Sequence, residues 1–83
     1  MKRSITLDPR VREQLRALTP LVRVRAGDAL LELAAADDPD ELAIGHPEYP
    51  DDPYIRQLRG LGFVMTVLFY DHRVVALTVH TDG

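Results

Sequence analysis

The sequence FVMTVLFYDHRVVALTVH, residues 63–80, decides the fold class of this chain. Two runs of β-branched, aromatic and aliphatic residues flank Asp71-His72, a pair that suits a tight turn. The stretch therefore predicts a β-hairpin with strands at Phe63 to Tyr70 and at Arg73 to His80.

The register of this hairpin follows if Tyr70 opposes Arg73, because side chains alternate between the two faces of a strand. One face then carries Phe63, Met65, Val67, Phe69, Val74, Ala76, Thr78 and His80, and the other carries Val64, Thr66, Leu68, Tyr70, Arg73, Val75, Leu77 and Val79. Both sets are largely apolar. We expect one face to pack on helices and the other to be covered by a loop, a second copy of the chain or a partner chain.

Two further strands and two helix starts are predicted before the hairpin. Tyr54 to Arg59 reads as a strand that ends at the turn Gly60-Leu61-Gly62, and Ser4 to Leu7 alternates as a short strand does. Asp8-Pro9 and Thr19-Pro20 each combine a capping residue with a proline, which favours the first turn of a helix.

The two helices are expected to be amphipathic and to form a hairpin. The second is expected to run to about Ala36, although Val22 to Arg25 also alternate as a strand would; the alanine and leucine that follow favour a helix. The inner faces are expected to carry Val11, Leu15 and Leu18 on the first helix, and Val22, Ala26, Ala29, Leu30 and Leu33 on the second. The sequence thus predicts an α+β fold of order β-α-α-β-β-β, with a helical hairpin packed on a small antiparallel-rich sheet.

Residues 37–53 have a different composition, with four of the six prolines and seven of the thirteen acidic residues. Asp40 to Ile44 suit a helical turn, and the stretch from Gly45 to Pro53 is predicted to be irregular. A loop of this length in a compact domain is usually functional or mobile.

The overall composition is typical of a soluble intracellular domain. Hydrophobic residues make up 46% of the 83 residues and charged residues 28%, which predicts one globular domain over residues 1–83. The absence of cysteine excludes disulfides, thiolate metal sites and a cysteine nucleophile, and it fits a reducing cytoplasm. No apolar run is long enough to span a membrane, and the N-terminus lacks the apolar core of a signal peptide.

The charges are segregated along the chain, whose net charge is −3. Residues 1–25 hold seven basic and two acidic residues, whereas residues 26–53 hold nine acidic and no basic residues. Binding of nucleic acid over the whole surface is therefore not expected, because it depends on a continuous basic patch. Solvated faces of mixed sign explain most of these charges.

Three stretches carry a resemblance to a known family. They are ITLDPRV at 5–11 with LRAL at 15–18, ALLELA at 29–34, and RQLRGLGF at 56–63 running on to RVVALTVH at 73–80. Together with the predicted order of elements, they resemble the RelE/ParE toxin superfamily of bacterial toxin–antitoxin systems. The likeness covers nearly the whole chain.

The resemblance implies a toxin that cleaves mRNA on the ribosome or inhibits DNA gyrase and is held in check by a cognate antitoxin. No cofactor is expected. The resemblance places catalytic roles on Arg59, before the glycine turn, and on His80, which ends the last strand, with Arg56 as a further basic residue. Phe63 stands where the family commonly has a tyrosine or histidine, and Val64 where it commonly has an arginine. The alternative is a catalytically silent relative that acts by protein contact, as a homodimer or an antitoxin-binding module.

Each candidate residue also has a simpler interpretation. Arg59 can hold a phosphate or pair with a loop carboxylate such as Asp51 or Asp52, and His80 can be an ordinary surface histidine at a strand end. His46, Glu48, Asp51 and Asp52 are metal-ligand types, but prolines separate them and their spacing fits neither a helix nor a strand, so no metal site is predicted.

Overall fold

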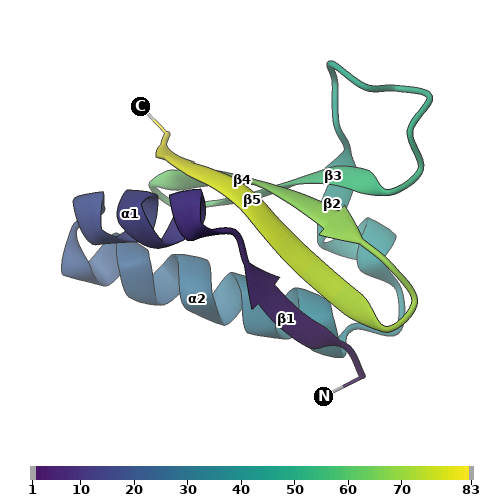
Figure 1. Ribbon diagram of the computed structural model, residues 1–83, viewed down its shortest axis with the longest axis horizontal. Coiled ribbons are helices and arrows are strands. Elements are labelled where there is room, and N and C mark those ends of the chain that lie inside the picture. Colours follow the sequence, from purple (N-terminus) through teal and green to yellow (C-terminus); the bar gives the residue numbers. More distant parts are fainter. Residues whose placement is uncertain (1, 83) are drawn as a thin grey trace.

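The computed structural model describes residues 2–82 and builds them around one five-stranded sheet (Figure 1). Its strands are β1 (Ser4–Leu7), β2 (Ala43–Gly45), β3 (Ile55–Gly60), β4 (Phe63–Phe69) and β5 (Arg73–Thr81). They lie in the order β1-β5-β4-β3-β2, with β1 parallel to β5 and every other pair antiparallel. The α+β class and the antiparallel-rich sheet are confirmed, with β2 as an additional strand.

The β4–β5 hairpin follows the predicted register only at the end near its turn. Phe69 pairs with Val74 and Val67 with Ala76, as expected. A β-bulge then shifts the register, so that Met65 pairs with Val79 and Val64 with His80. The prediction that Thr78 and His80 share a face with Phe63 is therefore wrong. The shift turns apolar Val79 into the core, where it is 2% exposed, and turns polar Thr78 and His80 to the other face.

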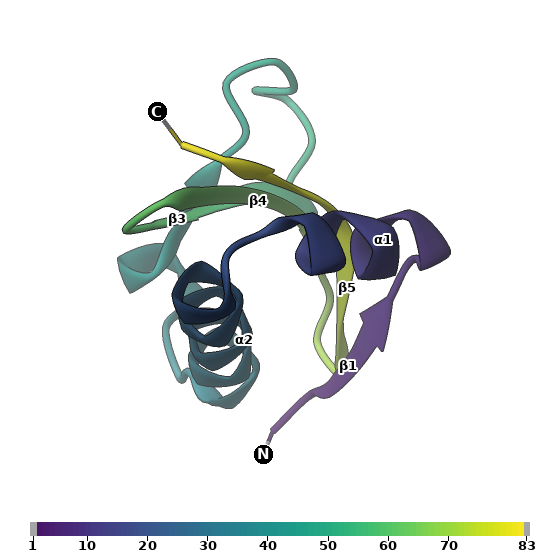
Figure 2. The ribbon, with the colours of Figure 1, turned by 90° about the vertical axis from the view of Figure 1, so that its left-hand side faces the viewer.

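Helix α2 (Pro20–Ala35) packs across one face of the sheet, and helix α1 (Pro9–Ala17) lies against the edge of β5, where Gln14 Oε1 accepts a hydrogen bond from the Val79 N–H at 2.7 Å (Figure 2). Each begins as predicted: the Asp8 carboxylate accepts a hydrogen bond from the Arg10 N–H, and the Thr19 hydroxyl accepts one from the Val22 N–H. The alternative of a strand at residues 22–25 is wrong. Neither helix is long and apolar enough to cross a membrane.

The core lies between the helices and the inner face of the sheet. Its buried residues are Val11, Leu18, Ala26, Leu30, Leu33, Ala34, Ala43, Leu58, Phe63, Met65, Val67, Phe69, Val74, Ala76 and Val79. This confirms the expected inner stripes of both helices, because Leu15, Val22 and Ala29 pack against the same cluster.

The acidic segment is more ordered than the sequence predicts. It contains a 3-10 helix, η1 (Pro39–Glu41), whose first turn is capped by the Asp38 carboxylate, and the short strand β2. The remaining loop, 46–54, rises on the side of the sheet away from α2 (Figures 1 and 2). It supplies part of the cover that the second apolar face was expected to need.

One arginine joins three distant parts of the chain. The Arg3 guanidinium donates from Nε to the Tyr70 carbonyl at 3.1 Å and from Nη1 to the Ala36 carbonyl at 2.9 Å. It also lies 4.2 Å from the centre of the Phe69 ring. These contacts fasten the N-terminus to the end of α2 and to the β4–β5 turn.

Replacing Arg3 with alanine is expected to lower the free energy of unfolding by about 2 kcal/mol, because two partly buried carbonyls and an aromatic face lose one cationic partner. Arg12→Ala is the matched control: Arg12 is exposed on α1, and its loss should cost less than about 0.5 kcal/mol. Urea denaturation followed by circular dichroism measures both. Equal stability of the two variants would contradict this role of Arg3.

Candidate functional site

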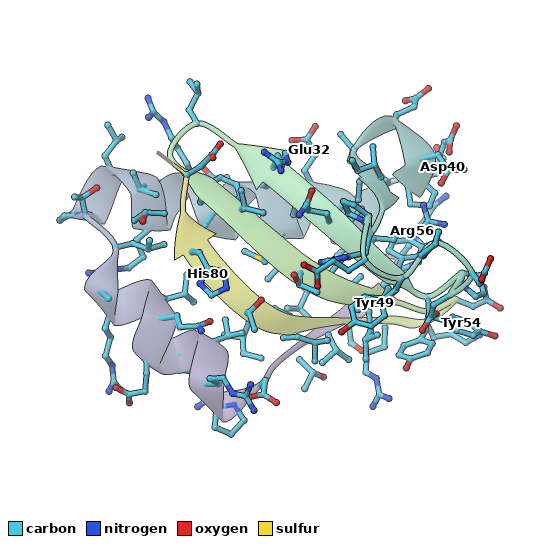
Figure 3. The ribbon with its side chains drawn as sticks, turned by 90° about the horizontal axis from the view of Figure 1, so that it is seen from above. Glu32, Asp40, Tyr49, Tyr54, Arg56 and His80 are labelled. Carbon is cyan, nitrogen blue, oxygen red and sulfur yellow. The ribbon has the colours of Figure 1, made fainter. Side chains whose placement is uncertain are left out.

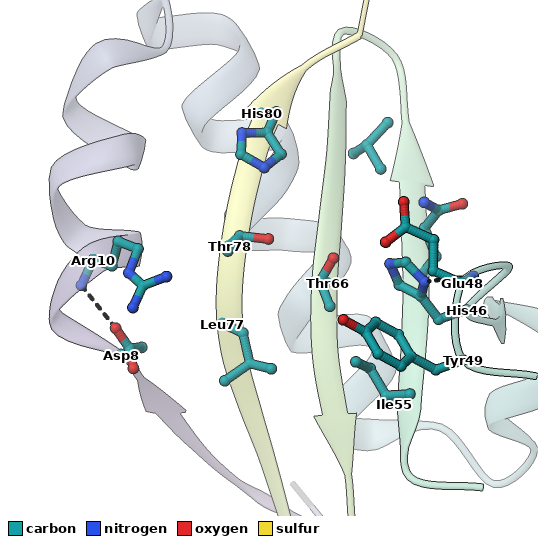
Figure 4. Close-up of a pocket in the computed structure, with 12 residues that line it drawn as sticks. Asp8, Arg10, His46, Glu48, Tyr49, Ile55, Thr66, Leu77, Thr78 and His80 are labelled. Carbon is teal, nitrogen blue, oxygen red and sulfur yellow. Dashed lines mark hydrogen bonds between the residues drawn. The ribbon is translucent and has the colours of Figure 1, made fainter. Parts of the chain in front are cut away.

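A pocket of about 510 Å³ lies on the outer face of the sheet, the face away from α2 (Figure 4). The start of α1 forms one wall, the loop after β2 forms the opposite wall, and strands β3, β4 and β5 form the floor. The lining residues are Asp8, Arg10, His46, Glu48, Tyr49, Ile55, Gln57, Val64, Thr66, Leu77, Thr78 and His80.

His80 reaches this pocket because of the β-bulge. Val64 pairs with His80 on one side and with Arg59 on the other, so these three residues stand on the same face of the sheet. Two strand spacings separate Arg59 from His80, which is roughly 10 Å. The structure therefore brings two of the three predicted catalytic residues to one face, and their catalytic roles stay predictions.

Arg59 is held by neighbours on its own side of the sheet. Its Nε donates to Gln57 Oε1 at 3.0 Å, and its Nη1 lies 3.9 Å from Asp82 Oδ2. The carboxylate beside Arg59 is thus that of Asp82 rather than Asp51 or Asp52. With a side chain 56% exposed, the guanidinium stands at the rim of the outer face, where an anion can approach it.

Arg56 lies on the opposite face of the sheet. It pairs with Val67, whose side chain is in the core, and its guanidinium forms an ion pair with Asp40 and a 3.4 Å hydrogen bond to the Ala43 carbonyl. Figure 3 shows Arg56 beside Asp40 and far from His80. The structure does not bring Arg56 together with Arg59 and His80; it places Arg56 where it fastens η1 and β2 to the sheet.

The loop wall of the pocket supplies residues that the sequence did not assign to a site with His80. His46 Nδ1 accepts a hydrogen bond from the Glu48 N–H at 3.2 Å, and the rings of His46 and Tyr49 are 5.3 Å apart. The only sequence signal was the density of such side chains between prolines, in HPEYP at 46–50. Within residues 2–82, no three His, Asp or Glu side chains gather closely enough to hold a metal ion.

No protein-family model and no curated protein sequence matches this chain. Solved structures do match it. The isolated Escherichia coli RelE toxin superimposes with a TM-score of 0.76, at 14% identity, over 98% of this chain and 85% of the toxin chain. The chain has the RelE fold.

Two toxin–antitoxin complexes show the same similarity. A chain of the intact E. coli RelBE complex matches with a TM-score of 0.73 and 16% identity, over 98% of both chains. A chain of the Mycobacterium tuberculosis RelBE2 complex matches with a TM-score of 0.72 and 15% identity, over 99% of this chain and 93% of its own length. The superfamily resemblance inferred from the sequence is thereby confirmed at the level of the fold.

The pocket on this RelE fold combines proton-transfer groups with few fixed charges. Its acidic and basic side chains, apart from the histidines, are Arg10, Asp8 and Glu48. The Asp8 carboxylate is occupied as the cap of α1, at 2.9 Å from the Arg10 N–H. The imidazoles of His46 and His80, the phenol of Tyr49 and the carboxylate of Glu48 remain to donate or accept protons. Such groups are suited to general acid–base catalysis.

Proposed function

We propose that this chain is the toxin of a toxin–antitoxin pair and that it cleaves RNA in the pocket on the outer face of the sheet. The single observation that carries the proposal is the placement of His80 and His46 in one open pocket of a RelE fold, with Arg10 in the opposite wall from His46. Proteins of similar fold include the E. coli RelE toxin and a chain of each of two RelBE toxin–antitoxin complexes.

The proposed chemistry uses the 2′-hydroxyl of the RNA as its nucleophile. One histidine removes the 2′-hydroxyl proton as the 2′-oxygen attacks phosphorus, and the other protonates the 5′-oxygen as the P–O5′ bond breaks. The products are a 2′,3′-cyclic phosphate and a free 5′-hydroxyl. Arg10 stabilises the charge that develops on the phosphoryl oxygens, and Arg59 binds an adjacent phosphate.

The partners that follow from this proposal are mRNA on the ribosome and a cognate antitoxin that covers the pocket. Both belong to the cytoplasm. No cofactor is required, because proton transfer and charge stabilisation are the whole of the chemistry.

Induced expression in a bacterial host tests the proposal, with growth followed and the 5′ ends of cellular mRNA mapped. We expect growth arrest together with new 5′-hydroxyl ends that keep a fixed phase relative to codons. Arrest without such ends would contradict RNA cleavage and would point to gyrase, which DNA supercoiling in the same cells reports. Co-expression with the product of a neighbouring short reading frame should restore growth if that frame encodes the antitoxin.

A second candidate function is that of a silent interaction module. The observation that favours it is the pocket's charge: two carboxylates and one guanidinium line it, and β4, which forms the centre of its floor, carries no charged residue. Unimpaired growth with verified soluble protein would support this candidate and contradict the proposed cleavage.

A further inference from the structure

Helix α2 has a second apolar face that points away from the rest of the molecule. Leu21 and Val24 are each 60% exposed and Leu31 is 50% exposed. Val24 and Leu31 are seven residues apart, almost two full turns, so they project to the same side. Figure 2 shows α2 nearly end on, with β3 and β4 above it and α1 to its upper right.

The opposite face of α2 is already used by the core. Ala26, Leu30 and Leu33 are buried there against the sheet. A helix that is apolar on two opposite faces is normally covered on both, because removing aliphatic surface from water lowers the free energy. We define Leu21, Val24 and Leu31 as the outer face of α2. This face is therefore expected to pack against another protein surface.

The exposed charges beside this outer face differ in sign between the two halves of α2. Arg25 lies in the first half of α2, and Asp28 and Glu32 lie in the second half. All three are exposed, and none takes part in the ion pairs found within residues 2–82. Arg23 differs from Arg25, because it donates to the carbonyls of Leu15, Arg16 and Leu18 at the end of α1.

We propose that two copies of this chain form a dimer by pairing their α2 helices antiparallel across a twofold axis. The midpoint of Val24 and Leu31 falls at Gly27-Asp28, which places the axis there and sets Val24 of each copy against Leu31 of the other. The same operation places Arg25 of each copy on the side of the partner helix that carries Asp28 and Glu32, with the two Asp28 side chains nearest the axis. A parallel arrangement would instead place Arg25 against Arg25.

Gly27 fits this crossing point. It is exposed, and a Cβ built on it would meet nothing within 4 Å. Because Gly27 has no side chain, the two helix backbones can approach closely at this position. The larger residues on either side of it can then interdigitate. The surface lies on α2 and the pocket on the face of the sheet away from α2, so the dimer does not depend on the proposed function.

Sedimentation velocity at about 5 to 500 µM tests the dimer, since one helix face gives a small interface and a dissociation constant of roughly 10 to 100 µM. Leu31→Ser should raise that constant at least tenfold. Ile44→Ser is the matched control, because Ile44 is a large apolar residue 57% exposed on β2, away from α2. It should leave the constant unchanged.

A charge exchange tests the antiparallel arrangement itself. Arg25→Glu and Glu32→Arg should each weaken the dimer by about tenfold, because each sets like charges together across the twofold axis, and the double variant should recover wild-type association. Circular dichroism confirms that each variant is folded. A monomer at all concentrations, a dimer weakened by Ile44→Ser but not by Leu31→Ser, or a double variant that fails to recover would each overturn the proposal.

Discussion

Replacing His80 with alanine is expected to slow RNA cleavage by a factor of about 100 to 10,000. In the proposed reaction His80 is one of the two proton-transfer groups, and no other imidazole lies on its strand. The side chain is exposed at the end of β5, so its removal should change the free energy of unfolding by less than about 0.5 kcal/mol. A large loss of rate with little loss of stability is the signature of a residue that acts on the substrate.

The measurement is single-turnover cleavage of a defined mRNA, on ribosomes and free, with purified protein. His72→Ala is the matched control, because His72 is an exposed histidine in the β4–β5 turn, outside the pocket; its rate should equal that of the wild type. His46→Ala should lose a similar factor to His80→Ala, and the double variant should lose little more, because the two groups act as one unit. Wild-type cleavage that survives His80→Ala would remove His80 from the mechanism.

The hairpin and the helix starts could be predicted because their signals are local. Alternation of apolar residues, a two-residue turn and a capping residue before a proline each act over a few positions. The β-bulge could not be predicted in this way. It exists because one extra residue in β5 lets Val79 enter the core, and that gain is visible only when β5 is packed on the helices.

The strand β2 was missed for a related reason. Three residues carry almost no strand signal, and Ala43 to Gly45 are extended because they pair with β3. Arg56 then ties the segment down through Asp40 and the Ala43 carbonyl. Such order depends on contacts between residues more than ten positions apart, which no local pattern records.

The candidate site was predictable only in its strand residues. Arg59 and His80 could be proposed through the resemblance to the RelE/ParE superfamily, which implies an arginine before the glycine turn and a histidine at the end of the last strand. His46 and Tyr49 enter the pocket that His80 lines because loop 46–54 rises over the outer face, and Arg10 enters it because α1 begins where β1 ends. These placements depend on the tertiary structure, which no local sequence pattern records.

Replacing Phe63 with alanine is expected to lower the free energy of unfolding by about 3 to 5 kcal/mol, the range for loss of a buried aromatic side chain. Phe63 is 1% exposed and is the largest fully buried side chain. Small domains have only about 5 to 15 kcal/mol of stability in total, so this single change removes a large part of it. Urea denaturation of the purified variants measures the loss, with Leu61→Ala as the control, since Leu61 in the adjacent turn is 74% exposed.

Gly60 shows what the Phe63 ring does in this sheet. The two residues are paired across β3 and β4, and a Cβ on Gly60 would overlap Phe63 Cε1 and lie 2.6 Å from Cζ. The ring thus occupies the space that any other residue at 60 would need. In the wild-type background Gly60→Ala should cost about 1 to 3 kcal/mol, because the buried ring has no room to move aside.

The two substitutions should therefore be strongly non-additive. Once Phe63→Ala has removed the ring, Gly60→Ala no longer meets an obstacle, and it should be neutral or stabilise by up to about 1 kcal/mol, because glycine is the more costly residue in a strand. Additive losses in the double variant would show that the cost at residue 60 arises elsewhere than in the contact with Phe63. The sign of this coupling separates steric exclusion by the ring from an intrinsic need for glycine in the β3 backbone.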